Sequence, residues 1–313
     1  MAYNNPFLDT YRNYVNKGWY GNVISHPSLS RWCENFKQVD ESQPFDPKMC
    51  AHFLLNALIF YQEKQLKAII LSIEDKIKCQ INQTFEKKLK RRLSESELKE
   101  YCDEYKSKSC VIAAAKPDAV GDSAHQASRM WRNTIGIETK AVSELKNVIT
   151  ENGKTHIFFV DDFVGTGTKM NSFLTDELFA DATLYGFKNV NSIINEYKDS
   201  VDFNIAVFAL HEKGYNLLSE HISTLNFYYG DMYNDEYDLL SDRCTLFDSF
   251  PNDKDNIINY LKTMQNKLDS NNPYALNLPI SFYHGCPNNS LSLYYKSNSE
   301  WYGLLSESHP TAI

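Results

Sequence analysis

Apolar residues recur at helical spacing along the first third of the chain. Asp46-Pro47 is typical of a helix start, because proline fits the first helical position. The apolar residues that follow at this spacing are Phe53, Leu54, Ala57, Leu58 and Tyr61, then Ile69, Ile70, Ile73, Ile77 and Ile81. Ser94-Glu95-Ser96-Glu97 predicts a capping box that opens another helix. We therefore expect residues 1–107 to form a mainly helical N-terminal region.

After Ser109, short apolar runs alternate with segments of helical pattern. The runs that predict strands are 110–115, 156–160, 203–210 and 225–229. The segments that predict helices are 124–133, 143–149, 190–198 and 215–222. This alternation predicts an α/β domain over residues 108–313, with a parallel sheet, helices on both faces and a loop-rich C-terminal extension. Ligands of such sheets bind beyond the carboxyl ends of the strands.

The composition is that of an ordinary globular protein. Of 313 residues, 42% are hydrophobic, 23% charged and 13% aromatic, which excludes a disordered chain. Only 12 glycines occur, which excludes collagen and glycine-rich linkers, and none lies between Gly21 and Gly121. The 32 Lys and Arg against 40 Asp and Glu give a formal charge of −8, which argues against nonspecific coating of DNA.

One basic run interrupts this acidic chain. Residues 87–92 read Lys-Lys-Leu-Lys-Arg-Arg and lie between two predicted helices. They are either a contact for a phosphate backbone or a solvated helix face.

Targeting and cysteine patterns indicate a soluble cytoplasmic protein. Residues 1–15 lack the apolar core of a secretory signal. The longest uncharged apolar stretch, 49–62, is shorter than the about 20 residues of a membrane-spanning helix, so no membrane partner is expected. The seven cysteines form no CxxC or CxC pair, which argues against a zinc ribbon or a disulfide framework.

The strongest chemical signal follows the strand predicted at 156–160. Asp161 and Asp162 end this strand, and a Gly/Thr turn leads into a helix that should begin near Thr168. Gly165 and Gly167 let backbone amides converge at the helix N-terminus, where an anion is favoured. The turn residues expected to bind phosphate are Gly165, Thr166, Gly167, Thr168 and Lys169. The two carboxylates suit ribose hydroxyls or a Mg²⁺ that the substrate carries.

Two other phosphate motifs do not fit. The spacing from Gly165 to Lys169 is too short for a Walker A loop, and Met170 stands where a dinucleotide fingerprint needs its third glycine. The alternative without function is a capped strand–turn–helix with exposed acids.

Residues 157–168 resemble the 5-phosphoribosyl 1-diphosphate (PRPP) loop of type I phosphoribosyltransferases. The resemblance implies a type I phosphoribosyltransferase-like fold, with Asp161 and Asp162 as catalytic residues that hold the ribose hydroxyls. It also implies that residues 165–169 bind the 5-phosphate and that Mg²⁺ arrives with the substrate, with Asp161 or Asp162 as the nearest candidate ligand. Phe163, Gly165 and Lys169 depart from the family pattern, which argues against an ordinary nucleotide-salvage enzyme.

A second loop follows the predicted strand 110–115. In the family a diphosphate loop follows an earlier strand, and here Lys116 and Ser123 are the candidates to receive diphosphate. Arg129 and Arg132 are spaced to share one helix face and could add charge for phosphate. Their alternative is surface solvation or pairing with a carboxylate.

The C-terminal segments 281–290 and 301–305, together with the Asp-Asp loop, are similar to phosphoribosyltransferase-like proteins of prokaryotic conflict systems. Some of those proteins are encoded beside retron reverse transcriptases and are regarded as antiphage effectors. The resemblance therefore implies a toxin effector. His284 in this segment is either a contact for a substrate base or an ordinary loop histidine.

Three hypotheses follow. The first is an enzyme that binds PRPP or a related ribose phosphate with Mg²⁺ and acts at its anomeric carbon. The second is a catalytically inactive module that senses PRPP or a nucleotide and regulates a partner. The third is an assembly role, in which the helical half docks on a reverse transcriptase and its DNA or RNA through residues 87–92.

Overall fold

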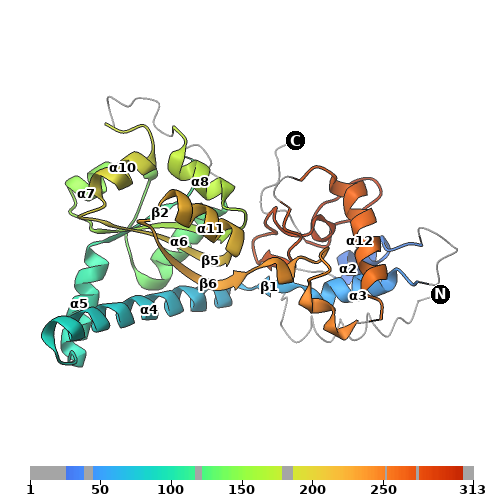
Figure 1. The fold of residues 1–313 in the computed structure, drawn as a ribbon, viewed down its shortest axis with the longest axis horizontal. Helices are drawn as coiled ribbons and strands as arrows, with labels where there is room; N and C mark the ends of the chain where they lie inside the picture. Colours follow the sequence, from blue (N-terminus) through green and yellow to red (C-terminus); the bar gives the residue numbers. More distant parts are fainter. Residues whose placement is uncertain are drawn as a thin grey trace. The chain divides into compact units, whose positions relative to one another are not determined.

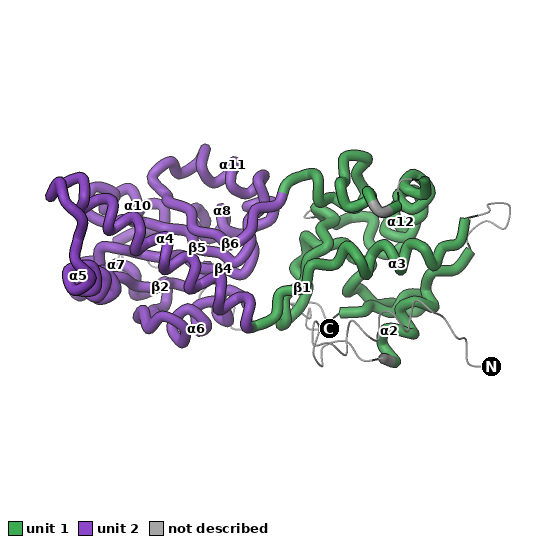
Figure 2. Tube along the Cα trace, turned by 90° about the horizontal axis from the view of Figure 1, so that it is seen from below, with its two compact units in different colours: residues 1–63, 234–313 green, residues 64–233 purple. Residues whose placement is uncertain are grey.

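A computed structural model describes residues 26–38, 45–116, 122–177, 186–250, 252–272 and 275–305. The chain forms two compact units (Figure 2). Unit 1 combines residues 1–63 with residues 234–313, and unit 2 is the continuous stretch 64–233. The units meet in the sequence after residues 63 and 233, whereas the sequence led us to expect one boundary near residue 107.

Unit 2 is built on a five-stranded parallel sheet of order β3-β2-β4-β5-β6. Its strands are β2 (Ser109–Ala113), β3 (Thr139–Lys140), β4 (His156–Val164), β5 (Asp202–His211) and β6 (Asn226–Tyr233). The expected parallel α/β sheet is confirmed, and the four apolar runs are its longer strands. The two-residue strand β3 was not predicted, because so short a strand leaves no apolar run.

Helices cover both faces of this sheet (Figure 1). One face carries η1 (Val142–Glu144), α7 (Leu145–Thr150), α8 (Thr168–Thr175), α10 (Val190–Tyr197) and α11 (Glu212–His221), whose apolar residues form one cluster with the strands. The other face carries α4 (Glu63–Leu89), α5 (Glu95–Ser107) and α6 (Ser123–Ile135). On that face Phe158 of β4 stacks on Trp131 of α6 and contacts Tyr105 of α5 edge-on.

The packing of α4 explains why residues 64–107 belong with the sheet. Ile70, Ile73 and Ile77 on its apolar face are buried. The helix approaches β6 so closely that a Cβ at Gly230 would lie 2.7 Å from Ile69 Cγ2. The sequence predicted that this segment is helical, but it did not predict that the helix packs against the sheet of unit 2.

Unit 1 joins the two ends of the described chain in one core. Its elements are α2 (His26–Cys33), α3 (Lys48–Ala57), β1 (Ile59–Tyr61), η2 (Asp235–Tyr237), η3 (Thr245–Ser249), α12 (Lys254–Asp269), β7 (Ile280–Phe282) and η4 (Ser292–Tyr294). Phe53 stacks on Phe247 with ring centroids 4.0 Å apart. The Trp32 indole donates a hydrogen bond to the carbonyl of Leu293 at 2.9 Å.

The helical pattern that we extended to Tyr61 ends earlier. Helix α3 stops at Ala57, and Ile59–Tyr61 form β1, which pairs in parallel with β7. The helical spacing of apolar residues wrongly predicted a helix at these three residues, because pairing with the distant strand β7 outweighs the local preference for helix. The capping box at Ser94 is confirmed: the Ser94 side chain accepts from the amide of Glu97, whose side chain accepts from the amide of Ser94.

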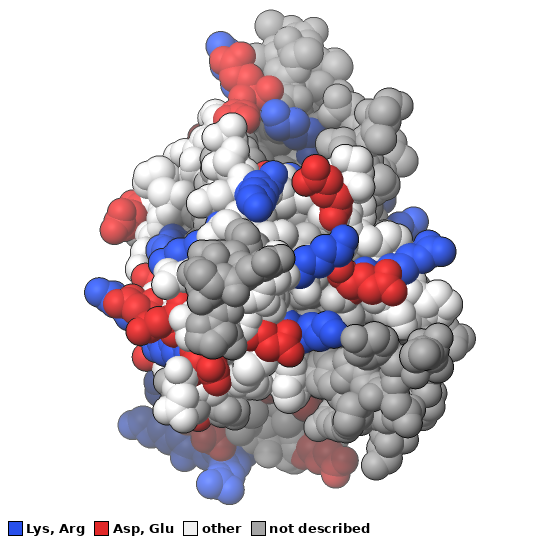
Figure 3. Space-filling view, turned by 90° about the vertical axis from the view of Figure 1, so that its right-hand side faces the viewer, with Lys and Arg blue, Asp and Glu red and all other residues white. Residues whose placement is uncertain are grey.

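Charges of both signs are interspersed on the face drawn in Figure 3, where Lys and Arg lie beside Asp and Glu. The formal charge of −8 is therefore not gathered into one patch on the coloured part of that face. None of the described helices is long and apolar enough to cross a membrane. None of the seven cysteines, all of which the structure describes, forms a disulfide, and burial raises the pKa of the Cys110 thiol to about 12.

Candidate functional site

The strand order reverses between β2 and β4. From β2 the chain passes through α6 to β3 on one side of β2, and then returns to β4 on the other side. At such a reversal the connecting helices leave on opposite faces of the sheet, so the loops after the two strands separate and open a site for ligands. The described residues that follow these strands are 114–116 after β2 and 165–167 after β4.

Two buried carboxylates lie at this edge. Asp161 and Asp162, near the end of β4, are 1% and 4% exposed. The Ser123 hydroxyl, on the first residue of α6, lies 3.2 Å from Asp161 Oδ1 and 2.9 Å from Asp162 Oδ1. One hydroxyl proton is thus shared between two carboxylates. The structure brings Ser123 and the two predicted acids together.

Lys169 is directed at the acids. Its Nζ lies 2.9 Å from Asp161 Oδ2 and 2.7 Å from Asp122 Oδ1. Asp122 was not singled out from the sequence, and it also caps α6 by accepting from the amide of Ala124 at 2.9 Å. The lysine side chain remains 46% exposed. Its expected phosphate contact would need this side chain to turn away from the carboxylates.

Burial and charge oppose each other at this cluster. Burial raises the pKa of Asp161 above its ordinary value; Lys169 counteracts this increase, while Asp162 adds to it. For Lys169, burial lowers the pKa, but the negative charges of Asp161, Asp122 and Asp162 outweigh burial and raise it. The cluster therefore holds buried negative charge that hydroxyl donors or a cation-bearing ligand would stabilise.

The turn after β4 has the geometry of an anion site. Gly167 adopts a left-handed conformation, with φ of 83°, and α8 begins at Thr168 as expected. The first amides of a helix have no partner within the helix, so they point at the space before it. The hydroxyls of Thr166 and Thr168 lie 3.1 Å apart beside these amides.

A further glycine, which the sequence analysis missed, supports this turn. A Cβ at Gly214 of α11 would lie 2.5 Å from the carbonyl oxygen of Gly165, and a Cβ at Gly167 would lie 2.9 Å from Gly214 Cα. Helix α11 and the turn can pack this closely only because both lack side chains at the contact. The available signal was an isolated glycine inside a helical pattern, which often marks close packing.

Among the described residues, no hydrogen bond or ion pair joins Lys116 or Arg129 to the acids; Lys116 pairs elsewhere. Lys116 Nζ is 3.6 Å from Asp176 Oδ2, at the end of α8. Arg129 is exposed on α6, six residues after Ser123 and thus about 9 Å further along the helix axis. Gly121 and the rest of 117–121 lie outside the described residues. The roles of Lys116 and Arg129 stay predictions.

The acids do not form a metal-binding cluster by themselves. Within the described ranges, no group of three or more His, Cys, Asp or Glu is arranged to hold a metal ion. The Lys169 ammonium occupies the position between Asp161 and Asp122 where a cation would bind. A cation at this position would therefore have to displace the Lys169 ammonium.

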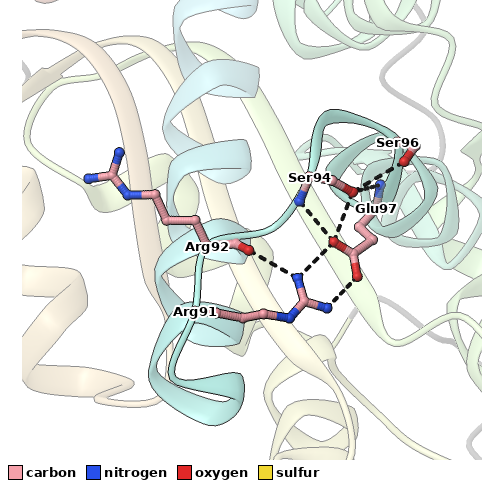
Figure 4. A network of polar contacts seen from close by, with 5 residues as sticks. All are labelled: Arg91, Arg92, Ser94, Ser96 and Glu97. Carbon is pink, nitrogen blue, oxygen red and sulfur yellow. Dashed lines mark hydrogen bonds and ion pairs between the residues drawn. The ribbon is translucent and has the colours of Figure 1, made fainter.

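The basic run makes contacts of its own at the start of α5. Arg91 makes two hydrogen bonds to Glu97, at 2.9 and 2.6 Å, and joins the capping box of α5 (Figure 4). This pairing lowers the pKa of Glu97. Arg91 thus has a structural partner, whereas Lys87 and Lys88 are exposed. His284 belongs to unit 1, and the acid pair belongs to unit 2.

Comparison with protein families agrees with this geometry. The model of the PRTase-CE family, which is phosphoribosyltransferase-like, matches residues 29–306, almost the whole chain. The chain belongs to the PRTase-CE family. The match supports both the α/β sheet and a phosphoribosyltransferase-like function for the PRTase-CE protein. It also spans both compact units, so unit 1 is part of what the family shares. No curated protein matches the sequence significantly.

Proposed function

We propose that this PRTase-CE protein binds PRPP or a closely related ribose phosphate and acts at its anomeric carbon. The observation that carries the proposal is the buried pair Asp161 and Asp162 on β4, which only Phe163 and Val164 separate from the Gly165–Gly167 turn. The pair lies where the strand order reverses between β2 and β4. Acids and turn amides that lie so close would match the hydroxyls and the 5-phosphate of one ribose ring.

Each group has a role in this proposal. Asp161 and Asp162 would accept hydrogen bonds from the ribose hydroxyls. The 5-phosphate would bind the amides of residues 165–169, with the hydroxyls of Thr166 and Thr168. Ser123 and Lys116 would receive the diphosphate, and Arg129 would add positive charge from α6. Mg²⁺, bound to the diphosphate as part of the substrate, would neutralise the leaving group.

The reaction would break the bond between the anomeric carbon and the diphosphate oxygen, whose electron pair leaves with diphosphate. A nucleophile with a lone pair, either water or an acceptor, then forms the new bond to that carbon. Positive charge develops on the ribose as the bond breaks, and the buried carboxylates are in position to stabilise it.

Lys169 would move during binding. Its ammonium would have to leave Asp161 before a ribose hydroxyl could reach the same oxygen. The side chain is 46% exposed and begins in the first turn of α8, so it can turn toward a phosphate at the amides of that turn. Ligand binding would then exchange an internal ion pair for a contact with phosphate.

Calorimetry on the full chain tests the binding step. We expect PRPP with Mg²⁺ to bind the wild type, and the double substitution Asp161→Asn, Asp162→Asn to weaken binding at least about tenfold. Asp199→Asn, an exposed acid distant in sequence from the turn, is the matched control and should leave the affinity unchanged. Equal affinity for all three proteins would contradict the proposal.

A second candidate is a sensor that binds the ligand without turnover. It is favoured by the state of Asp161, which is already bonded to Lys169 and Ser123, so ligand exchange at this residue could itself be a signal. Analysis of the PRPP incubated with the protein separates the two. Released diphosphate supports the enzyme, and binding with intact PRPP supports the sensor.

For the biological role, we propose a cytoplasmic effector of an antiphage defence system, associated with a retron reverse transcriptase and its DNA or RNA. The support is the resemblance of the Asp-Asp loop and of residues 281–290 and 301–305 to proteins of prokaryotic conflict systems. The test is expression in bacteria: toxicity or defence should be lost with Asp161→Asn, Asp162→Asn. Undiminished toxicity or defence in this variant would contradict a catalytic effector.

A further inference from the structure

A cavity lies in unit 2 at the amino ends of the sheet strands, whereas the acid pair lies near the carboxyl end of β4. Its volume is about 590 Å³, which is within the range of sites for small molecules. The floor includes His156, Asp202 and Asn226, the first residues of β4, β5 and β6, and the walls come from α4 and α5. His156 is five residues from Asp161 on the same strand, so about 16 Å separates the two sites.

Flat rings form much of the wall. Tyr105 stacks on His156 with centroids 4.1 Å apart, and Phe85 stacks on Tyr101 with centroids 3.8 Å apart. All four side chains line the cavity. Aromatic faces that are held rigid in this way favour a flat ligand, because stacking costs them little conformational entropy.

The cavity also offers hydrogen bonds of both kinds. The Tyr228 hydroxyl donates to Gln80 Oε1 at 2.7 Å, which leaves the Gln80 amide nitrogen with no partner among the described residues. Asn226 Nδ2 donates to Asn204 Oδ1 at 3.2 Å, which leaves the Asn226 oxygen without a partner in the same set. One free donor and one free acceptor match the edge of a heterocyclic base, which carries both kinds of group.

The ionisable Lys, Glu, His and Asp side chains that line the cavity contact each other. Lys108 Nζ lies 2.7 Å from Glu104 Oε1, and His156 Nδ1 lies 2.9 Å from Asp202 Oδ2. Among the described residues, the lining therefore has no unpaired cation for a phosphate. An uncharged ligand fits it best.

We propose that this cavity is a second ligand site, which binds an uncharged planar heterocycle of the nucleobase or nucleoside class. The site is separate from the proposed ribose phosphate site and does not rest on the activity proposed there. Tyr105, His156, Phe85 and Tyr101 supply its aromatic surfaces, and Gln80 and Asn226 supply its hydrogen bonds.

Titration calorimetry on the full chain tests the site, with adenosine, guanosine, cytidine and uridine as probes. At least one nucleoside should bind, and Gln80→Ala and Asn226→Ala should each weaken it about tenfold. Gln83→Ala is the matched control, because Gln83 is an exposed glutamine on α4 outside the cavity lining, and it should bind like the wild type.

Two further measurements separate this site from the first. The double variant Asp161→Asn, Asp162→Asn should keep full nucleoside affinity, and circular dichroism should show that the Gln80 and Asn226 variants are folded. The proposal is overturned if none of the four nucleosides binds. It is equally overturned if the folded Gln80 and Asn226 variants bind as tightly as the wild type, or if the Asp161, Asp162 variant loses nucleoside binding.

Discussion

Asp161 is the residue at which stability and the proposed function are most directly opposed. It is 1% exposed and has the carboxylate of Asp162 beside it, so its ionised form is costly unless Lys169 and Ser123 support it. The sequence revealed the acid pair, because two adjacent carboxylates directly follow the apolar run 156–160, although β4 itself continues to Val164. It did not reveal the direction of Lys169, since that depends on how the turn aims the first residues of α8.

We expect Asp161→Asn to stabilise the free protein at neutral pH, by on the order of 1–2 kcal/mol. A raised pKa in the folded state means that the wild type has its full stability below the unfolded value of about 3.9 and loses it as pH rises through the folded value. The advantage of the variant should therefore be largest at pH 7 to 9 and shrink toward pH 4.

Chemical denaturation of both proteins across this pH range measures that difference. Asp199→Asn again serves as the control, because its exposed side chain should give no comparable trend. A stability difference that grows as pH falls would show that Lys169 outweighs burial at Asp161.

At the scale of elements, unit 2 was the predictable part of the molecule. Strands of a parallel sheet are buried on both faces, so they read as continuous apolar runs, and the runs at 156–160 and 203–210 were found as β4 and β5. The start of α8 at Thr168 was predicted from the glycines of the turn. The contact of α11 with that turn could not be predicted, because it joins elements that local patterns treat separately.

Gly167→Ala should destabilise unit 2 by about 1 kcal/mol more than Gly136→Ala. Both glycines have positive φ, at 83° and 76°, so alanine is strained at either position. Only at Gly167 does the new Cβ also meet Gly214, whereas nothing lies within 4 Å at Gly136. Urea unfolding gives the difference, and calorimetry with PRPP should show weaker binding for Gly167→Ala alone. Equal effects of the two substitutions would mean that the turn tolerates a displacement of α11.

The capping box at the start of α5 gives a second test on an element. Ser94→Ala removes the side chain that accepts from the amide of Glu97 and should cost about 1 kcal/mol. Ser94→Asn keeps an acceptor at this position and should recover most of the loss. Urea unfolding of the three proteins checks this order. If Ser94→Ala causes no loss of stability, the start of α5 is instead stabilised by the Arg91–Glu97 pair, which both variants keep.

The chain divides into one unit built from both of its ends and one continuous unit, which the local sequence patterns did not predict. Phe53 and Phe247 share a core although unit 2 separates them in the sequence. Helical period and turn residues describe only neighbours along the chain, so they could not show that residues 234–313 complete the fold of residues 1–63. The same limitation hid the pairing of β1 with β7.

Trp32→Ala should destabilise unit 1 by about 3–5 kcal/mol and leave the candidate site intact. Trp32 is 0% exposed, and its indole bonds to Leu293 of the same unit. Calorimetric scanning should show one transition at lower temperature and another unchanged, with wild-type affinity for PRPP below the first transition. A single transition that shifts as a whole would instead show that the two units unfold together.

The split of unit 1 also sets an order of events on the ribosome. Because the amino end of a chain emerges first, residues 64–233 are complete before Phe247 or Tyr294 has been made. While the sheet of unit 2 forms, the side chains of Trp32 and Phe53 therefore lack the C-terminal residues that bury them in the complete protein. Nascent chains arrested before residue 247 would contain a complete unit 2, while the apolar residues of the amino segment would remain exposed. Exposed apolar surface of this kind is what chaperones bind.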